Sequence, residues 1–131
     1  MAHVASTAAG SRYCQAHTAS SAARNGVDAG KIDAVWTFDT DERFTDAERS
    51  ALRLARDAAS VPNATTGEHF DDLAPHFDEE QIVEIVAVIS LFGWLNRWND
   101  TMATDLEDEP LGFGRAHLAA QGWDPGKHAH P

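Results

Sequence analysis

The sequence contains little cysteine and little positive charge. Its 131 residues include one cysteine, and 10 lysine and arginine residues stand against 21 aspartate and glutamate residues, which gives a formal net charge of -11 at pH 7. A single cysteine excludes a disulfide-stabilised scaffold within this chain. The negative charge argues against nucleic acids and anionic membranes as partners, because both attract basic surfaces.

Long apolar segments are also missing. The longest apolar run, residues 85–95, is shorter than the roughly 20 residues that span a bilayer, and it is interrupted by Ser90 and Gly93. The first residues lack the basic region and the apolar run of a signal peptide. We therefore expect a cytoplasmic protein in which residues 85–95 belong to a core helix.

Alternation of apolar and polar residues with a period of two does not extend over four or more positions, which disfavours strands. A chain of this length suits one domain, so we expect a single all-α domain, 1–131, of six or seven helices. Pro110 is expected to end any helix that reaches it. The expected helices are a first segment stopped by Gly10, then 12–24, 28–36, 45–59, 66–76, 78–103 and 113–121, followed by a frayed tail over 126–131.

The expected helix 78–103 is apolar on nearly every side in its middle, so other elements must surround it. Trp94 and Trp98 belong to a second apolar stripe that a monomer of this size does not need, which indicates a subunit interface and a homo-oligomer. Gly93 suggests close passage of another backbone or subunit. Asn96 lies where an apolar residue is expected, so it should hydrogen-bond to a neighbouring helix or face a pocket at Cys14.

The one cysteine is followed three positions later by a histidine. On a helix, Cys14 and His17 share a face, and an imidazole one turn away can favour the reactive thiolate. Ser11 is the expected N-cap, which places Cys14 in the first turn, where the helix dipole also favours the thiolate. A structural interpretation stays open, because a lone cysteine often packs as a small apolar residue and a lone histidine often has a hydrogen-bonding role.

Two stretches resemble one known family. The segment 13–19, Tyr-Cys-Gln-Ala-His-Thr-Ala, and the later Leu-Asn-Arg-Trp-Asn-Asp at 95–100 are similar to the carboxymuconolactone decarboxylase family, and within it to the alkylhydroperoxidase D (AhpD)-like branch. The similarity covers about residues 4–110. It implies an AhpD-like helical bundle around a long central apolar helix, without the N-terminal helix or helices of the family, and assembly as a homo-oligomer.

The resemblance also implies site residues. Cys14 matches the second, exposed redox cysteine of the branch. His17 lies close to the position of the relay histidine, which in the family is one residue further along, where this sequence has Thr18. Ser11 stands where the family has its first cysteine, so no intramolecular disulfide can form. The relay glutamate of the family would lie at or before the first residue, and no acidic residue occurs before Asp28.

Three functions are compatible with these residues. The first is an AhpD-like antioxidant enzyme of the peroxiredoxin type, in which the Cys14 thiolate reduces a hydroperoxide, becomes a sulfenic acid and is restored by an external thiol reductant, with Tyr13 and Asn96 lining the pocket. The second is a catalytically degenerate oligomeric relative. The third is a cofactor-free, carboxymuconolactone-decarboxylase-like enzyme, a decarboxylase or hydrolase that acts on a small lactone-like substrate with His17 as acid or base. No nucleotide loop, flavin motif or persuasive set of metal ligands occurs, so we expect no cofactor and no metal.

Overall fold

The computed structural model describes residues 1–129, which form seven α-helices and three 3₁₀ turns. No strand occurs in this part of the chain, and the expected all-α class is confirmed. The α-helices are α1 (Ala2–Ala8), α2 (Arg12–Arg24), α3 (Ala29–Asp33), α4 (Asp46–Ala58), α5 (Gly67–Leu73), α6 (Glu79–Met102) and α7 (Asp108–His117), and the turns are η1 (Val35–Thr37), η2 (Ala119–Gln121) and η3 (Gly126–His128).

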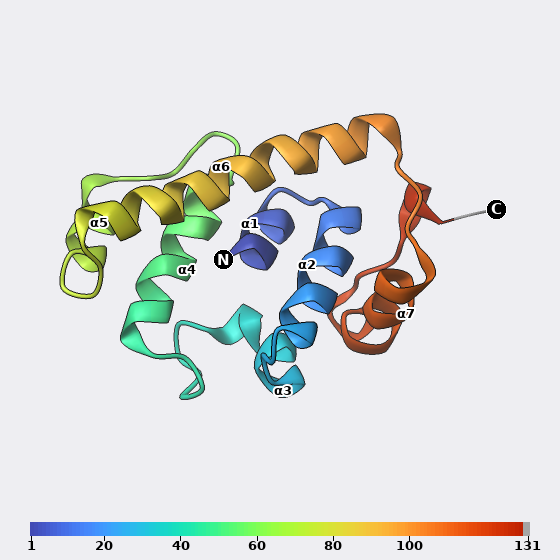
Figure 1. Ribbon diagram of the computed structural model, residues 1–131, viewed down its shortest axis with the longest axis horizontal. Helices are drawn as coiled ribbons and strands as arrows, with labels where there is room; N and C mark the ends of the chain where they lie inside the picture. The colour runs from blue at the N-terminus through green and yellow to red at the C-terminus, as the bar shows by residue number, and fades with distance from the viewer. Residues whose placement is uncertain (130–131) are drawn as a thin grey trace.

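The longest helix, α6, lies along one edge of the molecule (Figure 1). Helices α1, α2 and α4 pack against one of its sides, whereas α5 lies near one end of the molecule and α7 near the other. The opposite side of α6 carries exposed apolar side chains, so within this chain α6 is not surrounded as its composition predicts. None of the described helices is both long and apolar enough to cross a membrane.

Side chains cap the N-termini of α4 and α6. Thr45 accepts a hydrogen bond from the backbone N–H of Glu48, whose carboxylate accepts one from the Thr45 N–H, and Asp78 and Gln81 form the same reciprocal box at α6. These boxes satisfy N–H groups that a helix start otherwise leaves unpaired. The start of α2 differs, because the Ser11 hydroxyl makes no capping bond and donates to Asp100 instead.

Two groups of buried side chains hold the helices together. The first lies between α1, α4 and α6, and Leu54 and Leu73 are its largest fully buried members. The second joins α2 to the C-terminal part of the chain, where Ala16 and Ala19 of α2 contribute small side chains. Such residues allow close helix contact, so α7 can pack directly on the helix that carries Cys14.

The C-terminal part differs from the sequence prediction. Helix α7 begins at Asp108, with Pro110 in its first turn, where a missing N–H leaves no hydrogen bond unmade. The chain then returns to α2, where the indole of Trp123 donates to the Arg12 carbonyl at 3.0 Å. His128 is buried in η3, so the expectation of a frayed tail is wrong as far as residue 129. Residues 130 and 131, which the same expectation covered, lie outside the described residues.

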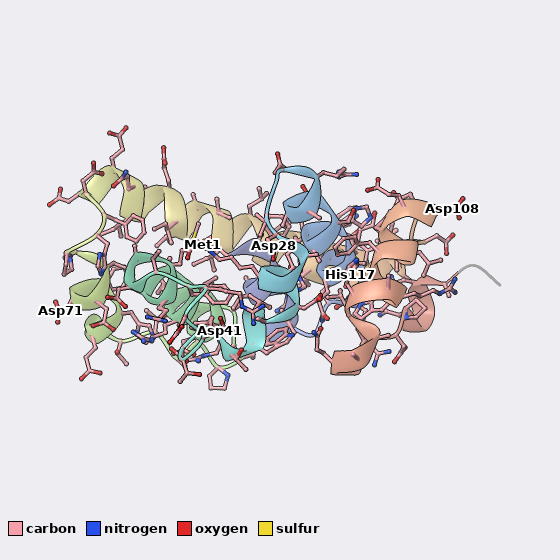
Figure 2. All side chains as sticks on the ribbon, turned by 90° about the horizontal axis from the view of Figure 1, so that it is seen from below. Met1, Asp28, Asp41, Asp71, Asp108 and His117 are labelled. Carbon is pink, nitrogen blue, oxygen red and sulfur yellow. The ribbon has the colours of Figure 1, made fainter. Side chains whose placement is uncertain are left out.

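Side-chain contacts also join the end of α7 to the end of α3; Figure 2 labels His117 on α7 and Asp28 at the start of α3. Nδ1 of His117 is 3.5 Å from a carboxylate oxygen of Asp33, and the Gln121 amide donates to the Asp33 carbonyl at 2.9 Å. These contacts join the C-terminal helix to the segment that follows α2. The C-terminal part is therefore attached both to the start of α2, through Trp123, and to α3, through His117 and Gln121.

Gly114 on α7 provides a test of this packing. A Cβ atom added at Gly114 would lie 2.5 Å from the ring of Trp123, whereas one added at Gly112 meets nothing within 4 Å. We expect Gly114→Ala to lower the free energy of unfolding by about 1–3 kcal/mol, because the buried indole must move. Gly112→Ala, on the exposed side of the same helix, should raise it by up to about 1 kcal/mol. Urea unfolding of both variants checks this, and equal stabilities would contradict the packing.

Candidate thiol site

Cys14 lies in the first turn of α2 and is only 3% exposed. The Nδ2 atom of Asn99 on α6 is 3.8 Å from its Sγ atom, and the side chain of Ser11 also hydrogen-bonds to the thiol. The implied exposed cysteine is therefore wrong for this chain, because α6 covers the sulfur. A reactant can reach Sγ only when the neighbouring side chains move.

Burial also changes the acidity of this thiol. Desolvation raises the pKa of Cys14, and the nearby Asp100 carboxylate raises it further, although the hydrogen bonds from Ser11 and Asn99 act in the opposite direction. The net pKa is above the ordinary value, so Cys14 is a thiol at neutral pH. The expectation that the helix dipole and His17 favour a thiolate is wrong, because burial outweighs them.

His17 lies one turn after Cys14 and interacts with an acidic residue from the other end of the chain. Its Nε2 atom is 2.7 Å from a carboxylate oxygen of Glu107, and the hydroxyl of Tyr13 donates to the other oxygen at 3.4 Å. The Tyr13 and His17 rings are 4.4 Å apart. Burial and then the Glu107 charge raise the pKa of Tyr13. We name Tyr13, His17 and Glu107 the outer cluster.

Thr18 supports the helix and does not reach the thiol. Its hydroxyl donates to the Cys14 carbonyl at 2.6 Å, and the same oxygen lies 3.1 Å from Nδ1 of His3 on α1. Nδ1 of His3 is also 3.1 Å from the Gln15 carbonyl. Thr18 thus joins α1 to the turn that carries Cys14.

Asn96 is 3% exposed, but neither atom of its amide has a hydrogen-bond partner within residues 1–129. The expectation that a neighbouring helix satisfies it is therefore wrong. Asn99, one turn further along α6, makes the contact with Cys14 that the sequence suggested for Asn96. Asn96 instead belongs to the wall of a cavity of about 1120 Å³ between α4 and α6.

A second chain of polar contacts leads from the thiol to the C-terminal turn. Ser11 donates to Oδ1 of Asp100 at 3.4 Å, and Nε2 of His128 lies 3.1 Å from the same oxygen. Asp100 lines the cavity that Asn96 also lines. We name Ser11, Asp100 and His128 the inner chain. The described residues contain no group of three or more histidine, cysteine or acidic side chains arranged to hold a metal ion.

The structure thus brings Ser11, Tyr13, Cys14 and His17 to one end of α2 and adds residues that the sequence did not single out. Asn99 and Asp100 stand inside the stretch at 95–100, and their spacing from Asn96 places all three on neighbouring turns. The sequence around Glu107 and His128 does not indicate that they belong to the site, because only the fold brings them close to His17 and Asp100. Glu107 supplies an acid beside His17 where the sequence offers none upstream.

Comparison with known proteins agrees with this architecture. Residues 1–57 match the sequence model of the carboxymuconolactone decarboxylase family. The expected resemblance to this family is confirmed over that segment, whereas the match does not assign the AhpD-like branch. No match was found among curated proteins.

Two solved structures resemble the chain closely. One is the apo form of the debrominase Bmp8, with 39% sequence identity and a TM-score of 0.81 over 90% of this chain. The other is a cysteine-to-alanine variant of Bmp8 in complex with 2,3,4-tribromopyrrole, with the same identity and TM-score over 91% of this chain. The chain spans 61% and 62% of the lengths of these two Bmp8 chains.

Proposed function

We propose that the protein is a thiol-dependent reductase that removes bromine from small brominated heteroaromatic compounds through Cys14. The observation that carries the proposal is the one cysteine of this chain, placed in the first turn of α2 in a fold similar to a debrominase. A Bmp8 variant in which one cysteine is replaced by alanine was crystallised with a tribrominated pyrrole. This supports a sulfur-based reaction on a related substrate class.

The proposed reaction begins with the Cys14 thiolate attacking a bromine atom of the substrate. The carbon–bromine bond breaks, a sulfur–bromine bond forms, and the carbon keeps the electron pair and takes up a proton. An external thiol then attacks the sulfur, which releases bromide and leaves a mixed disulfide. A second external thiol restores Cys14 and leaves as a disulfide, because these 131 residues contain no second cysteine to do so.

Hydroperoxide reduction is the second candidate, favoured by the resemblance of residues 13–19 and 95–100 to the AhpD-like branch. There the Cys14 thiolate attacks the distal peroxide oxygen, the oxygen–oxygen bond breaks, and the leaving alkoxide or hydroxide takes up a proton. The resulting sulfenic acid is reduced by two equivalents of external thiol. Both reactions transfer an electrophilic atom to the same sulfur, and both need a thiolate and a proton.

The two substrates can be compared directly. The protein is incubated with an external dithiol and either 2,3,4-tribromopyrrole or an organic hydroperoxide, and bromide release and peroxide loss are measured. The proposal expects a debrominated pyrrole by mass spectrometry and stoichiometric bromide. Peroxide loss without bromide release would favour the second candidate. If neither bromide release nor peroxide loss is observed, both candidate functions are contradicted. The catalytically degenerate relative and the lactone enzyme would then be the functions still open.

We also propose that the chain assembles with copies of itself through the open side of α6. Leu91, Trp94, Trp98 and Met102 are each more than half exposed, and the rings of Trp94 and Trp98 are 5.7 Å apart. Gly93, between Phe92 and Trp94, has open space around it within the described residues. An apolar surface of this kind favours association, and a second copy of α6 is a matching partner.

Trp94→Glu tests this assembly. Burying an unpaired carboxylate in the contact costs about 3 kcal/mol or more, so the dissociation constant should rise at least about a hundredfold. The chain itself should stay folded, because Trp94 is 58% exposed. Sedimentation velocity measures the change, with Trp36→Glu as the control at an exposed tryptophan outside α6. A wild-type monomer at micromolar concentration would contradict the proposal.

A further inference from the structure

His128 is the most buried histidine of the described chain, with 1% exposure. It lies in η3, and the Leu106 backbone N–H donates to its carbonyl at 2.8 Å. Its ring is placed between the Thr104 carbonyl and the Asp100 carboxylate. The outer cluster and the inner chain adjoin at this residue, because the centroid of the Tyr13 ring lies 5.7 Å from that of the His128 ring.

The two hydrogen bonds of this ring determine where its hydrogens lie. Nδ1 is 2.7 Å from the Thr104 carbonyl oxygen, which can only accept, so Nδ1 carries a hydrogen. Nε2 is 3.1 Å from Oδ1 of Asp100, which also accepts from the Ser11 hydroxyl. An ionised carboxylate can only accept, so Nε2 carries a hydrogen too. The two contacts therefore fit an imidazolium paired with Asp100, whose side chain is 33% exposed.

We propose that His128 is a positioning residue of the Cys14 site, whose positive charge compensates Asp100 and thereby sets how readily the thiol loses its proton. The inference concerns the thiol that the proposed function uses, and it deepens that function. Asp100 alone would disfavour a thiolate, because two negative charges would lie close together in a poorly solvated place. The imidazolium opposes this repulsion.

Other charged groups also lie near Ser11, Asp100 and His128. From α2, the Arg12 guanidinium pairs with Asp124, and the Tyr13 hydroxyl binds Glu107. From η3 itself, the Lys127 ammonium donates to the backbone carbonyl of Asp100 and adds a positive charge near it. From the segment after α6, Asp105 and Glu107 flank Leu106, and Glu107 is bound by His17.

The test measures the thiol without any substrate. The rate of Cys14 alkylation by iodoacetamide is followed against pH in the wild type, His128→Gln and Asp100→Asn. Loss of the imidazolium should move the alkylation midpoint to higher pH, with about tenfold slower alkylation near neutral pH. Loss of the carboxylate should move the midpoint to lower pH. His117→Gln, a histidine beside Asp33 on the other side of α7, should leave the midpoint unchanged.

Opposite shifts in the two variants distinguish charge compensation from a packing defect, which would expose the thiol and accelerate alkylation in both. Unchanged midpoints, or shifts in the same direction, would overturn the proposal. If His128→Gln does not fold, nitrogen-15 NMR of the wild type decides. The proposal expects hydrogens on both ring nitrogens of His128 near neutral pH, and a single ring hydrogen overturns it. Because no substrate is involved, these results hold whether or not the protein debrominates a pyrrole.

Discussion

Replacing Cys14 with serine should abolish both bromide release and peroxide consumption, with a loss of about a thousandfold or more. A hydroxyl is a far weaker nucleophile than a thiolate at neutral pH, and no other thiol in these 131 residues can take its place. The side chain is nearly isosteric and lies beside Ser11 and Asn99, which can hydrogen-bond to the new hydroxyl. Helicity and the free energy of unfolding should therefore change little.

Turnover is measured by bromide release and by peroxide loss with an external dithiol. Ser21→Ala, two turns further along α2, is the matched control and should retain wild-type turnover. Activity should also rise with pH in the wild type, because burial raises the pKa of the Cys14 thiol and a higher pH is needed for the thiolate. A serine variant that keeps its turnover would rule out the sulfur mechanism for both substrates.

The second large effect is expected from His3 when the protein is acidified. Burial lowers the pKa of His3 from 6.5 to about 4, so the folded chain keeps the ring neutral where the unfolded chain protonates it. The stability contribution is complete above pH 6.5 and is lost as the pH falls to about 4. This loss should reach about 3 kcal/mol, since each pKa unit corresponds to about 1.4 kcal/mol.

Carboxylates titrate in part of the same range, so His3→Gln supplies the comparison. The glutamine amide can still donate to the Gln15 carbonyl but does not titrate, so its free energy of unfolding should fall less steeply on acidification. Urea unfolding of both proteins across this range gives the difference, and His76→Gln, at an exposed histidine, is the control. Identical pH dependence of the wild type and His3→Gln would show that the ring is not buried in the neutral form.

The fold was largely predictable because its signals are local. The reciprocal boxes at Thr45 and Asp78 mark two helix starts by residues three positions apart, and the left-handed φ of 76° at Gly10 explains the break before α2. The start of α7 was misplaced, because Pro110 reads as a helix end unless it falls in the first turn. The packing of Trp123 and His128 on α2 and α6 depends on the complete fold.

The site was predictable only around α2. Cys14 and His17 follow from spacing on one helix, but their environment is set by residues that are close only in space. The burial of Cys14 depends on Asn99, 85 positions later, and the partner of His17 is 90 positions away. Sequence spacing therefore indicated a thiolate, whereas desolvation by distant elements makes the group a thiol.

These long separations bear on how the thiol is handled while the protein is made. Cys14 on α2 leaves the ribosome before α6, which is needed to cover it, and the turn with His128 follows α6. Because a chain emerges from its N-terminus at about 5–20 residues per second, the sulfur stays uncovered for several seconds on each nascent chain. The interval in which this thiol is open to cellular oxidants and alkylating agents therefore precedes folding, and packing of α6 against α2 ends it.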